Sequence, residues 1–403
     1  MRILQLCHKP PRPALDGGCL AMDAMTMGFL ENGAQVKVIT ASTHTHPIRM
    51  DEVDPAYLDA TDLEAVRIET ELDIRDAYVA LMNRDSYTIS RFYAHHHAMV
   101  IKQALSRRRY DVVQLESLYT TPYIDIIRRH APNALISLRS HNHEYQVLEQ
   151  RWEAMKNPFK RAFLRLASNS LERYEKDVLD KVDVVVAISE GEADGYRTWG
   201  YSGPLHVSSY GVDTTSPGLK PSAPPNPGRP LRLFHVGAMN WLPNREGIDW
   251  FIASVWPTLR TRHPDLEFHI AGKGLHPLRH AEVSGVVNHG EVPDSDAFAT
   301  ERDLLVVPLL RGAGIRVKIV QAMANGIPVA TTTKGGHGLG LANGEGIALD
   351  SPDAFADCIS EIVRHPDRLA QLGDQGMTVA RTRFDRRVIA QNLMGFYSSY
   401  IQP

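Results

Sequence analysis

Residues 303–330 read DLLVVPLLRGAGIRVKIVQAMANGIPVA and contain an apolar run, a glycine-bearing loop, a helical pattern and a second apolar run, in that order. The first run, 303–307, ends at Pro308, and the second, 327–331, follows a helix that we expect to begin near Gly314. Short runs that are apolar on both faces and separated by a helix are typical of parallel strands buried between helices. This stretch therefore predicts a βαβ unit with a loop at the carboxyl end of its first strand.

The same alternation of short apolar runs and helical patterns continues through both halves of the chain. It predicts an α/β fold of two doubly wound, Rossmann-like domains with parallel sheets, facing each other across a cleft. In such sheets, ligands bind beyond the carboxyl ends of the strands. The expected strands are 2–6, 35–40, 66–69, 111–115, 134–138, 183–188 and 205–208 in the first half, and 231–236, 266–271, 285–288, 303–307, 327–331 and 346–349 in the second.

A proline-rich segment separates the two halves. Residues 211–230 contain six prolines, and because proline lacks an N–H and has a fixed φ, this segment can form neither a helix nor a central strand. We therefore predict a first domain at 1–210, a linker at 211–230 and a second domain at 231–384. Two domains suit a chain of 403 residues.

The composition excludes several classes of function. A formal net charge of -3 opposes a dedicated nucleic-acid binder. Cys7, Cys19 and Cys358 are too few and too scattered for a disulfide framework or a zinc site, so we expect the reducing cytoplasm. No apolar run reaches the length of about 18 residues that a transmembrane helix needs. Met1 leads directly into a strand-like segment, so we expect no secretory leader and a soluble protein.

The loop and helix within 303–330 form the first candidate site. The N–H groups in the first turn of a helix, together with the helix dipole, bind anions. We expect Arg316 and Lys318 in this first turn, where cations oppose the dipole unless an anion lies between them. The sequence therefore predicts a diphosphate site here. The alternative is that both residues are solvated surface charges.

Two strand ends in the first half are further candidates. Gly17 and Gly18 follow the strand 2–6, and they would let a ligand approach the backbone at the start of a helix. An ordinary turn explains them equally well. His141 follows the strand 134–138 and could polarise a hydroxyl or contact a phosphate. The alternative for His141 is that it caps the next helix.

A fourth candidate segment, GAMNWLPNREG at 237–247, directly follows the first strand of the second domain. Asn244 has the character of a helix N-cap, and Arg245 lies near that helix start. Other conspicuous motifs predict no site. The histidines 95–97 are consecutive and cannot share one face of a helix, and Asp294 is better explained as an N-cap. No dinucleotide-binding or P-loop glycine pattern is present.

Together, these segments resemble the retaining glycosyltransferases of family 4, which have the GT-B fold. The resemblance covers essentially the whole chain, and its combination of motifs is more specific than any one of them. The motifs that carry it are the Gly17-Gly18 turn, the His141-Asn142 strand end, the 237–244 segment, Lys318 to Ala324, and Gly326-Ile-Pro-Val.

The resemblance implies transfer of a sugar, with retention of configuration, from a nucleotide-diphosphate sugar to a hydroxyl acceptor on a glycan, a lipid-linked molecule or another compound. The second domain would bind most of the donor and the first most of the acceptor, without a metal or other cofactor. His141, Arg316 and Lys318 are the expected catalytic residues. The expected donor-binding residues are Gly17, Gly18, Asn142, Gly237, Asn240, Arg245, Gly314, Ile315 and Gln321.

The chain departs from the family pattern at the donor site. The family has two glutamates eight positions apart, where this chain has Ala313 and Gln321. It also has an arginine and a lysine after the first strand of the second domain, where this chain has Met239 and either Asn244 or a shifted Arg245. We infer that Arg316 and Lys318 neutralise the diphosphate instead, and that Gln321 can still hydrogen-bond a ribose hydroxyl.

Two other functions stay open. A nucleotide-sugar epimerase or hydrolase of the same fold would need an acid and a base, and His141, His143 and Glu144 are the candidates. A non-catalytic nucleotide-sugar-binding partner subunit would explain Ala313 and Gln321. As the family implies, we expect the last helix, within 385–403, to pack back on the first domain through the apolar residues Val388, Leu393, Phe396 and Tyr397.

A basic and aromatic stretch at 151–166 suggests a peripheral contact with the inner face of the cell membrane. Basic side chains beside aromatic ones suit adsorption to an anionic bilayer. Pro158 should break the stretch, so that a surface helix begins near Phe159. The alternative is that the aromatic residues pack on the sheet and the charges form a solvated face.

Overall fold

The computed structural model describes residues 1–71, 86–153, 155–215, 229–276, 279–280, 282–312, 315–341 and 347–401. The chain folds into two units. Unit 1 contains Met1–Gly211 and Arg386–Pro403, and unit 2 contains Val212–Asp385. Unit 2 is thus inserted into unit 1. Most of the predicted linker, residues 216–228, lies outside the described part of the chain.

Unit 1 is built on a sheet of seven parallel strands in the order β3-β2-β1-β4-β5-β6-β7. The first strand lies inside the sheet and later strands are added on both sides of it, which is the doubly wound order that the sequence predicts. The strands are β1 (Arg2–Cys7), β2 (Gln35–Ser42), β3 (Glu64–Arg67), β4 (Val112–Glu116), β5 (Leu135–Ser140), β6 (Val184–Ala187) and β7 (Leu205–Val207).

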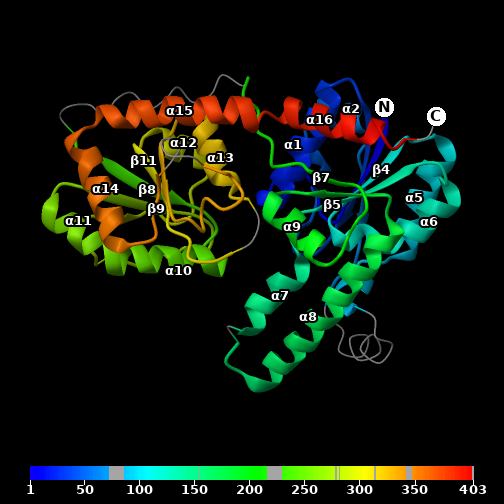
Figure 1. Cartoon of the computed structure of the whole chain (residues 1–403), viewed down its shortest axis with the longest axis horizontal. Helices are drawn as coiled ribbons and strands as arrows, with labels where there is room; N and C mark the ends of the chain where they lie inside the picture. Colours follow the sequence, from blue (N-terminus) through cyan, green and yellow to red (C-terminus); the bar gives the residue numbers. More distant parts are fainter. Residues whose placement is uncertain are drawn as a thin grey trace. The chain divides into compact units, whose positions relative to one another are not determined.

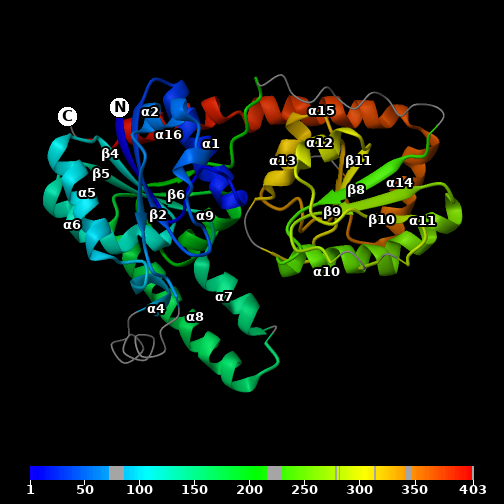
Figure 2. The same cartoon turned by 180° about the vertical axis from the view of Figure 1, so that it is seen from behind.

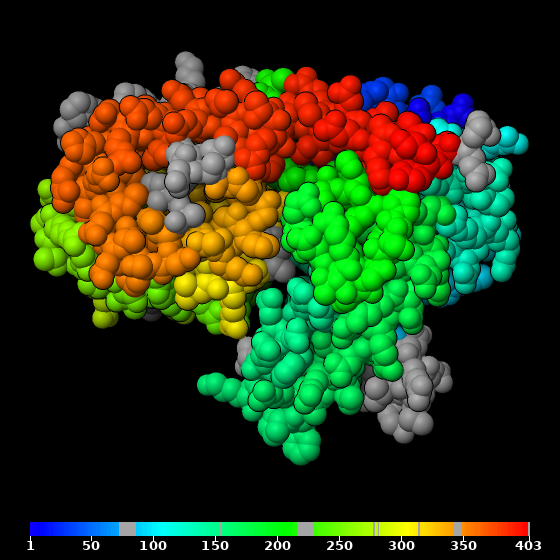
Figure 3. Space-filling model, viewed as in Figure 1, coloured from blue at the N-terminus to red at the C-terminus, as the bar shows by residue number. Residues whose placement is uncertain are grey.

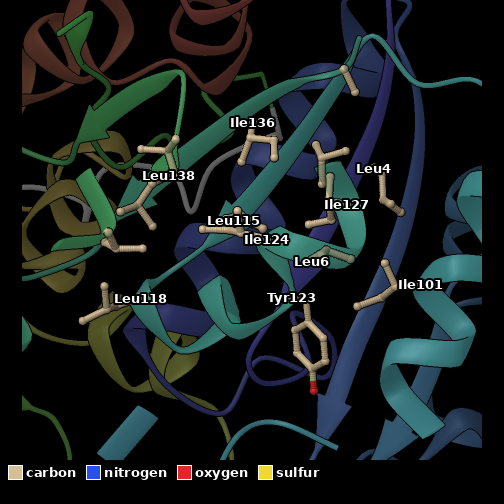
Figure 4. Close-up of a cluster of buried hydrophobic side chains, with 14 of the residues drawn as sticks. Leu4, Leu6, Ile101, Leu115, Leu118, Tyr123, Ile124, Ile127, Ile136 and Leu138 are labelled. Atoms are coloured by element: carbon tan, nitrogen blue, oxygen red, sulfur yellow. The ribbon is translucent and has the colours of Figure 1, made fainter. Parts of the chain in front are cut away.

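Both faces of this sheet are covered by helices, as a parallel sheet requires. Figure 4 shows the core on one face, where Leu4, Leu6 and Leu115 of the strands meet Ile124 and Ile127. The helices whose residues join this core are α4 (Tyr87–Ser90), α5 (His95–Arg107), α6 (Ile124–His130), α8 (Pro158–Val178) and α9 (Glu190–Thr198).

The opposite face of the sheet lies under α1 (Gly17–Glu31), α2 (Pro55–Thr61) and α16 (Arg386–Ser398), which Figure 2 shows on one side of unit 1. The last helix is part of this core, because Leu393 and Tyr397 are fully buried against it. Arg386 also forms an ion pair with Glu31 of α1. The second core of unit 1 therefore combines the two ends of the chain.

A helical pair extends away from the sheet of unit 1, as Figures 1 and 3 show. It consists of α7 (Glu144–Glu153) and α8. The predicted break occurs at Pro158, which occupies the first turn of α8, and the side chain of Asn157 caps this helix by accepting bonds from the N–H groups of Phe159 and Lys160.

Unit 2 contains a second parallel sheet, in the order β10-β9-β8-β11-β12-β13. Its first strand again lies inside the sheet. The strands are β8 (Arg232–Val236), β9 (Glu267–Ala271), β10 (Val286–Asn288), β11 (Leu304–Val307), β12 (Val329–Thr331) and β13 (Ile347–Ala348). The helices are α10 (Leu242–Trp250), a π-helical segment (Phe251–Val255), α11 (Trp256–Arg262), α12 (Ser295–Thr300), α13 (Val317–Ala324), α14 (Pro352–Arg364) and α15 (Asp367–Arg383).

Two predicted helix starts in unit 2 are wrong. The helix expected near Gly314 begins at Val317, so Arg316 is its N-cap residue and only Lys318 lies in the first turn. Asn244 is not an N-cap, because α10 already begins at Leu242 and Asn244 lies inside it. Asp294 does cap α12, as predicted. Within the described part of the chain, no helix is long and apolar enough to cross a membrane.

Candidate functional site

The strand ends of unit 2 hold a lysine among neutral partners. Lys318, in the first turn of α13, donates to Asn244 Oδ1 at 3.2 Å, and its Nζ lies 3.2 Å from His235 Nε2. Gly237 follows β8 at this point, and a Cβ there would lie 2.3 Å from Lys318 Nζ. A larger residue at position 237 would therefore displace the lysine.

The tautomer of His235 follows from its bonds. Its Nδ1 lies 2.7 Å from the carbonyl oxygen of Val306, which can only accept, so Nδ1 carries the proton and Nε2 accepts from Lys318. Burial, reinforced by Lys318, holds the pKa of His235 well below its usual value, so the ring is neutral. Burial and the nearby Arg316 lower the pKa of Lys318 to about 7. A lysine in this state gains strongly from a bound anion.

Arg316 lies beside this lysine as the buried N-cap residue of α13. Its guanidinium lies over the ring of Trp241, 5.3 Å from the centroid. Burial lowers the pKa of Arg316 to about 10, so it stays charged at neutral pH. Gly312 has a φ of +122°, and a Cβ there would lie 2.9 Å from Arg316 Nη2. Glycine at this position thus leaves room for the arginine.

The other residues predicted for the donor site have different surroundings. Gln321 is half-buried one turn after Lys318, and Ile315 is half-buried just before α13. Asn240 is exposed, and Arg245 is half-buried on α10. Gly314 and the substituted position Ala313 lie outside the described residues.

The strand ends of unit 1 contain a buried carboxylate instead. Glu116, the last residue of β4, accepts from Arg139 Nη1 at 3.0 Å and from His141 Nε2 at 2.7 Å, both on Oε2. Its Oε1 accepts from Gln5 Nε2 at 2.8 Å and from Gln114 Nε2 at 2.6 Å. Burial opposes its charge, but Arg139 and then His141 outweigh burial and lower the pKa of Glu116 to about 2. This carboxylate is therefore ionised.

His141 is neutral in this cluster. Its burial lowers its pKa more than Glu116 raises it. The ring of His8 lies near it, with 6.2 Å between the ring centroids. The Asn142 side chain hydrogen-bonds Glu144, the first residue of α7.

A network of charged side chains surrounds the Gly17-Gly18 turn. The carboxylate of Asp16 caps α1 by accepting from the N–H of Cys19 at 3.0 Å. Both of its oxygens also accept from Lys9 Nζ at 2.7 Å, and His46 Nε2 lies 3.0 Å from Oδ2. A Cβ on Gly18 would lie 2.8 Å from Lys9 Nζ. Glycine here makes room for a lysine of the same unit.

A set of buried carboxylates joins the helical pair to the sheet. Glu175 of α8 accepts from the N–H groups of Glu144 and Tyr145 in the first turn of α7, at 3.3 and 3.4 Å. Burial and then Glu175 raise the pKa of Glu144 to about 7, and burial raises the pKa of Glu192 to about 8. His143 lies between Glu175 and Glu192, and these neighbours raise its pKa despite its burial.

Two family models match the chain in succession. Residues 24–211 match the glycosyl transferase 4-like domain, and residues 230–365 match glycosyl transferases group 1. This chain is a glycosyl transferase. It transfers a sugar from a nucleotide-sugar donor, and the matches leave its acceptor unspecified. The resemblance drawn from the sequence is thereby confirmed, as is the transferase class.

Known proteins similar to this glycosyl transferase share its fold over almost their whole length. Sucrose-phosphate synthase from Thermosynechococcus elongatus has a TM-score of 0.70 and 16% identity, covering 99% of both chains. HepE of Anabaena, in complex with UDP-glucose, has a TM-score of 0.63 and 16% identity, covering 99% of this chain and 100% of its own. These likenesses confirm the GT-B fold.

A curated relative of this glycosyl transferase is an uncharacterized 44.6 kDa protein in the cps region of Klebsiella pneumoniae. It is 21% identical over 305 residues, which cover 73% of this chain and 76% of that protein.

Glu116 and Lys9 are not among the site residues predicted from the sequence of the glycosyl transferase, and Asn244 is predicted as an N-cap rather than as a partner of Lys318. A signal for Glu116 does exist, because polar residues recur at alternate positions of runs that are otherwise apolar. The set is Gln5, Gln114, Glu116, Ser137 and Arg139. No local pattern identifies the partners of Lys9 and Asn244, which lie 7 and 74 positions away.

Proposed function

We propose that Lys318, Arg316 and the first turn of α13 bind the diphosphate of the nucleotide-sugar donor. The observation that carries this proposal is the state of Lys318. It is desolvated at a helix start, next to a second cation, and its hydrogen-bond partners His235 and Asn244 are neutral. An anion with two charges would stabilise both cations, and the dipole of α13 would add to this at the helix start.

Gln321 lies one turn further along α13, and we propose that it bonds a donor hydroxyl. We propose a uridine nucleotide as the donor, because the similar HepE structure contains UDP-glucose. The family resemblance supports retention of configuration, with His141 acting on the transferred sugar. Lys318 and Arg316 would then stabilise the departing diphosphate.

A panel of UDP-, GDP- and ADP-sugars tests the donor proposal by isothermal titration. Lys318→Ala and Arg316→Ala should each lower affinity by roughly 10- to 150-fold, which corresponds to about 1.5–3 kcal/mol for a charge-assisted contact. Arg381→Ala removes an exposed charge of α15 in the same unit and should leave affinity unchanged. Equal affinity in the wild type and both site variants would refute the proposal.

We also propose that transfer needs no divalent metal, because two cations and a helix start supply the positive charge at the diphosphate. Nucleotide release should continue in EDTA at an unchanged rate. Complete loss in EDTA with recovery on addition of magnesium or manganese would contradict this mechanism.

We propose that the acceptor is lipid-linked and that the tip of the α7–α8 pair contacts an anionic membrane surface. Phe159, Phe163 and Leu166 lie at i, i+4 and i+7, on one side of α8, and are 86%, 43% and 49% exposed. They therefore do not pack on the sheet, contrary to the alternative explanation of this stretch. Arg161 and Arg165 lie over the ring of Trp152, 5.4 and 5.7 Å from its centroid.

This tip combines the two terms that bind a peripheral protein to an anionic bilayer. The exposed aromatic and aliphatic groups can enter the interface, and each nearby basic residue adds about 1 kcal/mol near a charged surface. Contact here would place the protein at the inner face of the membrane, where a lipid-linked acceptor is available.

Co-sedimentation with phosphatidylglycerol-containing vesicles tests the membrane proposal. The triple variant of Lys160, Arg161 and Arg165 to glutamate should abolish binding at low salt, and Phe159→Ser should weaken it. The matched control changes the exposed residues Arg107, Arg108 and Arg109 of the same unit to glutamate and should bind. Equal loss in both triple variants would show only a general charge effect and would overturn the proposal.

A further inference from the structure

The face of the unit 1 sheet beneath α1 and α16 carries a row of buried polar side chains. Gln5, Gln114, Glu116, Ser137 and Arg139 are all inaccessible to solvent. They come from the adjacent strands β1, β4 and β5, where Gln5 is paired with Gln114, and Glu116 with Arg139. Strands at the centre of a parallel sheet are usually apolar on both faces. This row therefore needs an explanation other than core formation.

The row forms a continuous path of hydrogen bonds that ends at His141. Tyr397 of α16 donates to Gln114 Oε1 at 2.8 Å, and Gln114 Nε2 donates to Glu116 Oε1 at 2.6 Å. Thr26 of α1 donates to Gln5 Oε1 at 2.6 Å, and Gln5 donates to the same oxygen of Glu116. Two covering helices thus fix the carboxylate that His141 contacts.

The four donors determine how Glu116 can bond. Both glutamines occupy Oε1, which leaves Oε2 to Arg139 and His141. The carboxylate is ionised and can only accept, so the proton of the contact at 2.7 Å belongs to His141 Nε2. The neutral ring has one proton, and its Nδ1 is consequently a lone-pair acceptor.

We propose that Glu116 is a positioning residue that holds His141 in the Nε2–H tautomer, so that Nδ1 accepts a hydrogen bond from a sugar hydroxyl during transfer. The arrangement matches the general rule that a catalytic or ligating histidine is oriented by a carboxylate on its other nitrogen. With its proton on Nε2, the ring can accept a hydrogen bond at Nδ1 from a donor such as a hydroxyl, but it cannot donate one there to an anion. This inference rests on the proposed role of His141 in sugar transfer.

The first test measures the tautomer in the ligand-free enzyme. Long-range ¹H–¹⁵N correlation on histidine-labelled protein identifies the His141 ring by the signals lost in His141→Gln. We expect neutral His141 with its proton on Nε2 from pH 6 to 8, and a mixed or Nδ1–H tautomer in Glu116→Gln. A wild-type ring that is an imidazolium or carries its proton on Nδ1 would overturn the proposal.

The second test asks whether Glu116 and His141 act together. It measures the kinetics of nucleotide release from a nucleotide sugar that the wild type accepts. Glu116→Gln should lower kcat by up to about 100-fold, as when a reacting group is misplaced by about 1 Å, with the donor KM unchanged. His141→Ala should have a similar effect. The double variant should be no slower than His141→Ala alone, because both changes remove one interaction.

Thr61→Val is the matched control, because it also removes a buried hydrogen bond of unit 1, from Thr61 Oγ1 to the carbonyl oxygen of Tyr57, but lies outside the polar row. It should keep the wild-type kcat even if its melting temperature falls as far as that of Glu116→Gln. Additive effects of Glu116→Gln and His141→Ala would assign Glu116 a purely structural role and refute the proposal. If the wild type shows the Nε2–H tautomer but His141→Ala keeps full activity, the role of His141 in transfer is refuted instead.

Discussion

The strand ends of the two units treat charge in opposite ways, although both sheets are parallel and doubly wound. In unit 1, Glu116 is neutralised by Arg139, and Lys9 by Asp16. In unit 2, Lys318 has the neutral partners His235 and Asn244, and the cation Arg316 lowers its pKa further. The comparison shows that a parallel, doubly wound sheet does not by itself determine which charges lie at the carboxyl ends of its strands. The carboxylate of Glu116 is thus paired within unit 1, whereas for Lys318 of unit 2 the partner that we propose is the diphosphate of the donor.

The largest expected effect concerns how each unit is held together. Deletion of 386–403 should unfold unit 1, because Leu393 and Tyr397 are fully buried and each buried side chain contributes about 1.5–3 kcal/mol. Unit 2 should keep its structure. Hydrogen exchange with mass spectrometry reports the two units separately, and deletion of 399–403 alone is the control. Protected amides throughout unit 1 of the longer deletion would contradict the packing of α16.

A smaller effect should appear in the pH dependence of donor affinity. Lys318 has a pKa of about 7 in the free protein, and a bound diphosphate would raise it, so binding takes up a proton above pH 7. Affinity for the nucleotide sugar should therefore fall by up to about tenfold per unit as the pH rises from 7 to 9. Titration calorimetry in buffers of different ionisation enthalpy measures the proton. Lys318→Arg should abolish the dependence, and a flat wild-type profile would argue against Lys318 as a ligand.

The two units should also respond to pH with opposite signs. In unit 1, Glu144 and Glu192 have folded-state pKa values of about 7 and 8, above the usual 4.5. The folded state binds more protons than the unfolded state in this range, so unit 1 should lose stability as the pH rises from 7 to 9. In unit 2, the lowered pKa of Lys318 means that the unfolded state binds more protons, and its stability should increase.

Denaturant titrations at pH 7, 8 and 9, followed by hydrogen exchange in each unit, measure how the free energy of unfolding of each unit changes with pH. We call this change the slope of that unit. Glu192→Gln should flatten the slope of unit 1 and leave that of unit 2 unchanged. Lys318→Met should do the reverse. If the stabilities of the two wild-type units changed with pH in the same direction, the prediction of opposite signs would be wrong.

The smallest expected effect is the loss of one hydroxyl from each unit. Tyr397→Phe removes the bonds to Gln114 and Ser137, and Thr331→Val removes the bond to the carbonyl of Val307. Each should lower the free energy of unfolding by about 1–3 kcal/mol, because a buried partner is left unsatisfied. Only Tyr397→Phe should also reduce the protection of strands β4 and β5 in hydrogen exchange. Equal losses of protection in both sheets would show that the polar row has no special role.

Most of the fold could be predicted from the sequence, because strand and helix periods are local. The break at Pro158 follows from residues within one turn of each other. Helix starts were less accurate: α13 begins three residues after Gly314, and α10 begins before Asn244. The alternating polar positions mark Glu116 as unusual, but its partners could not be predicted, because Arg139 reaches Glu116 only through the pairing of β4 with β5, 23 positions away.

The insertion of unit 2 into unit 1 has a consequence for the order of folding during synthesis. Residues 1–211 leave the ribosome first, yet their second core stays open until Leu393 and Tyr397 emerge. About 175 residues of unit 2 are made in between, which takes about 10–35 s at 5–20 residues per second. During that interval the apolar strip on α1 that will receive α16 is exposed, while unit 2 can already be complete. The nascent chain is therefore most vulnerable to aggregation, and most dependent on chaperones, in its N-terminal part.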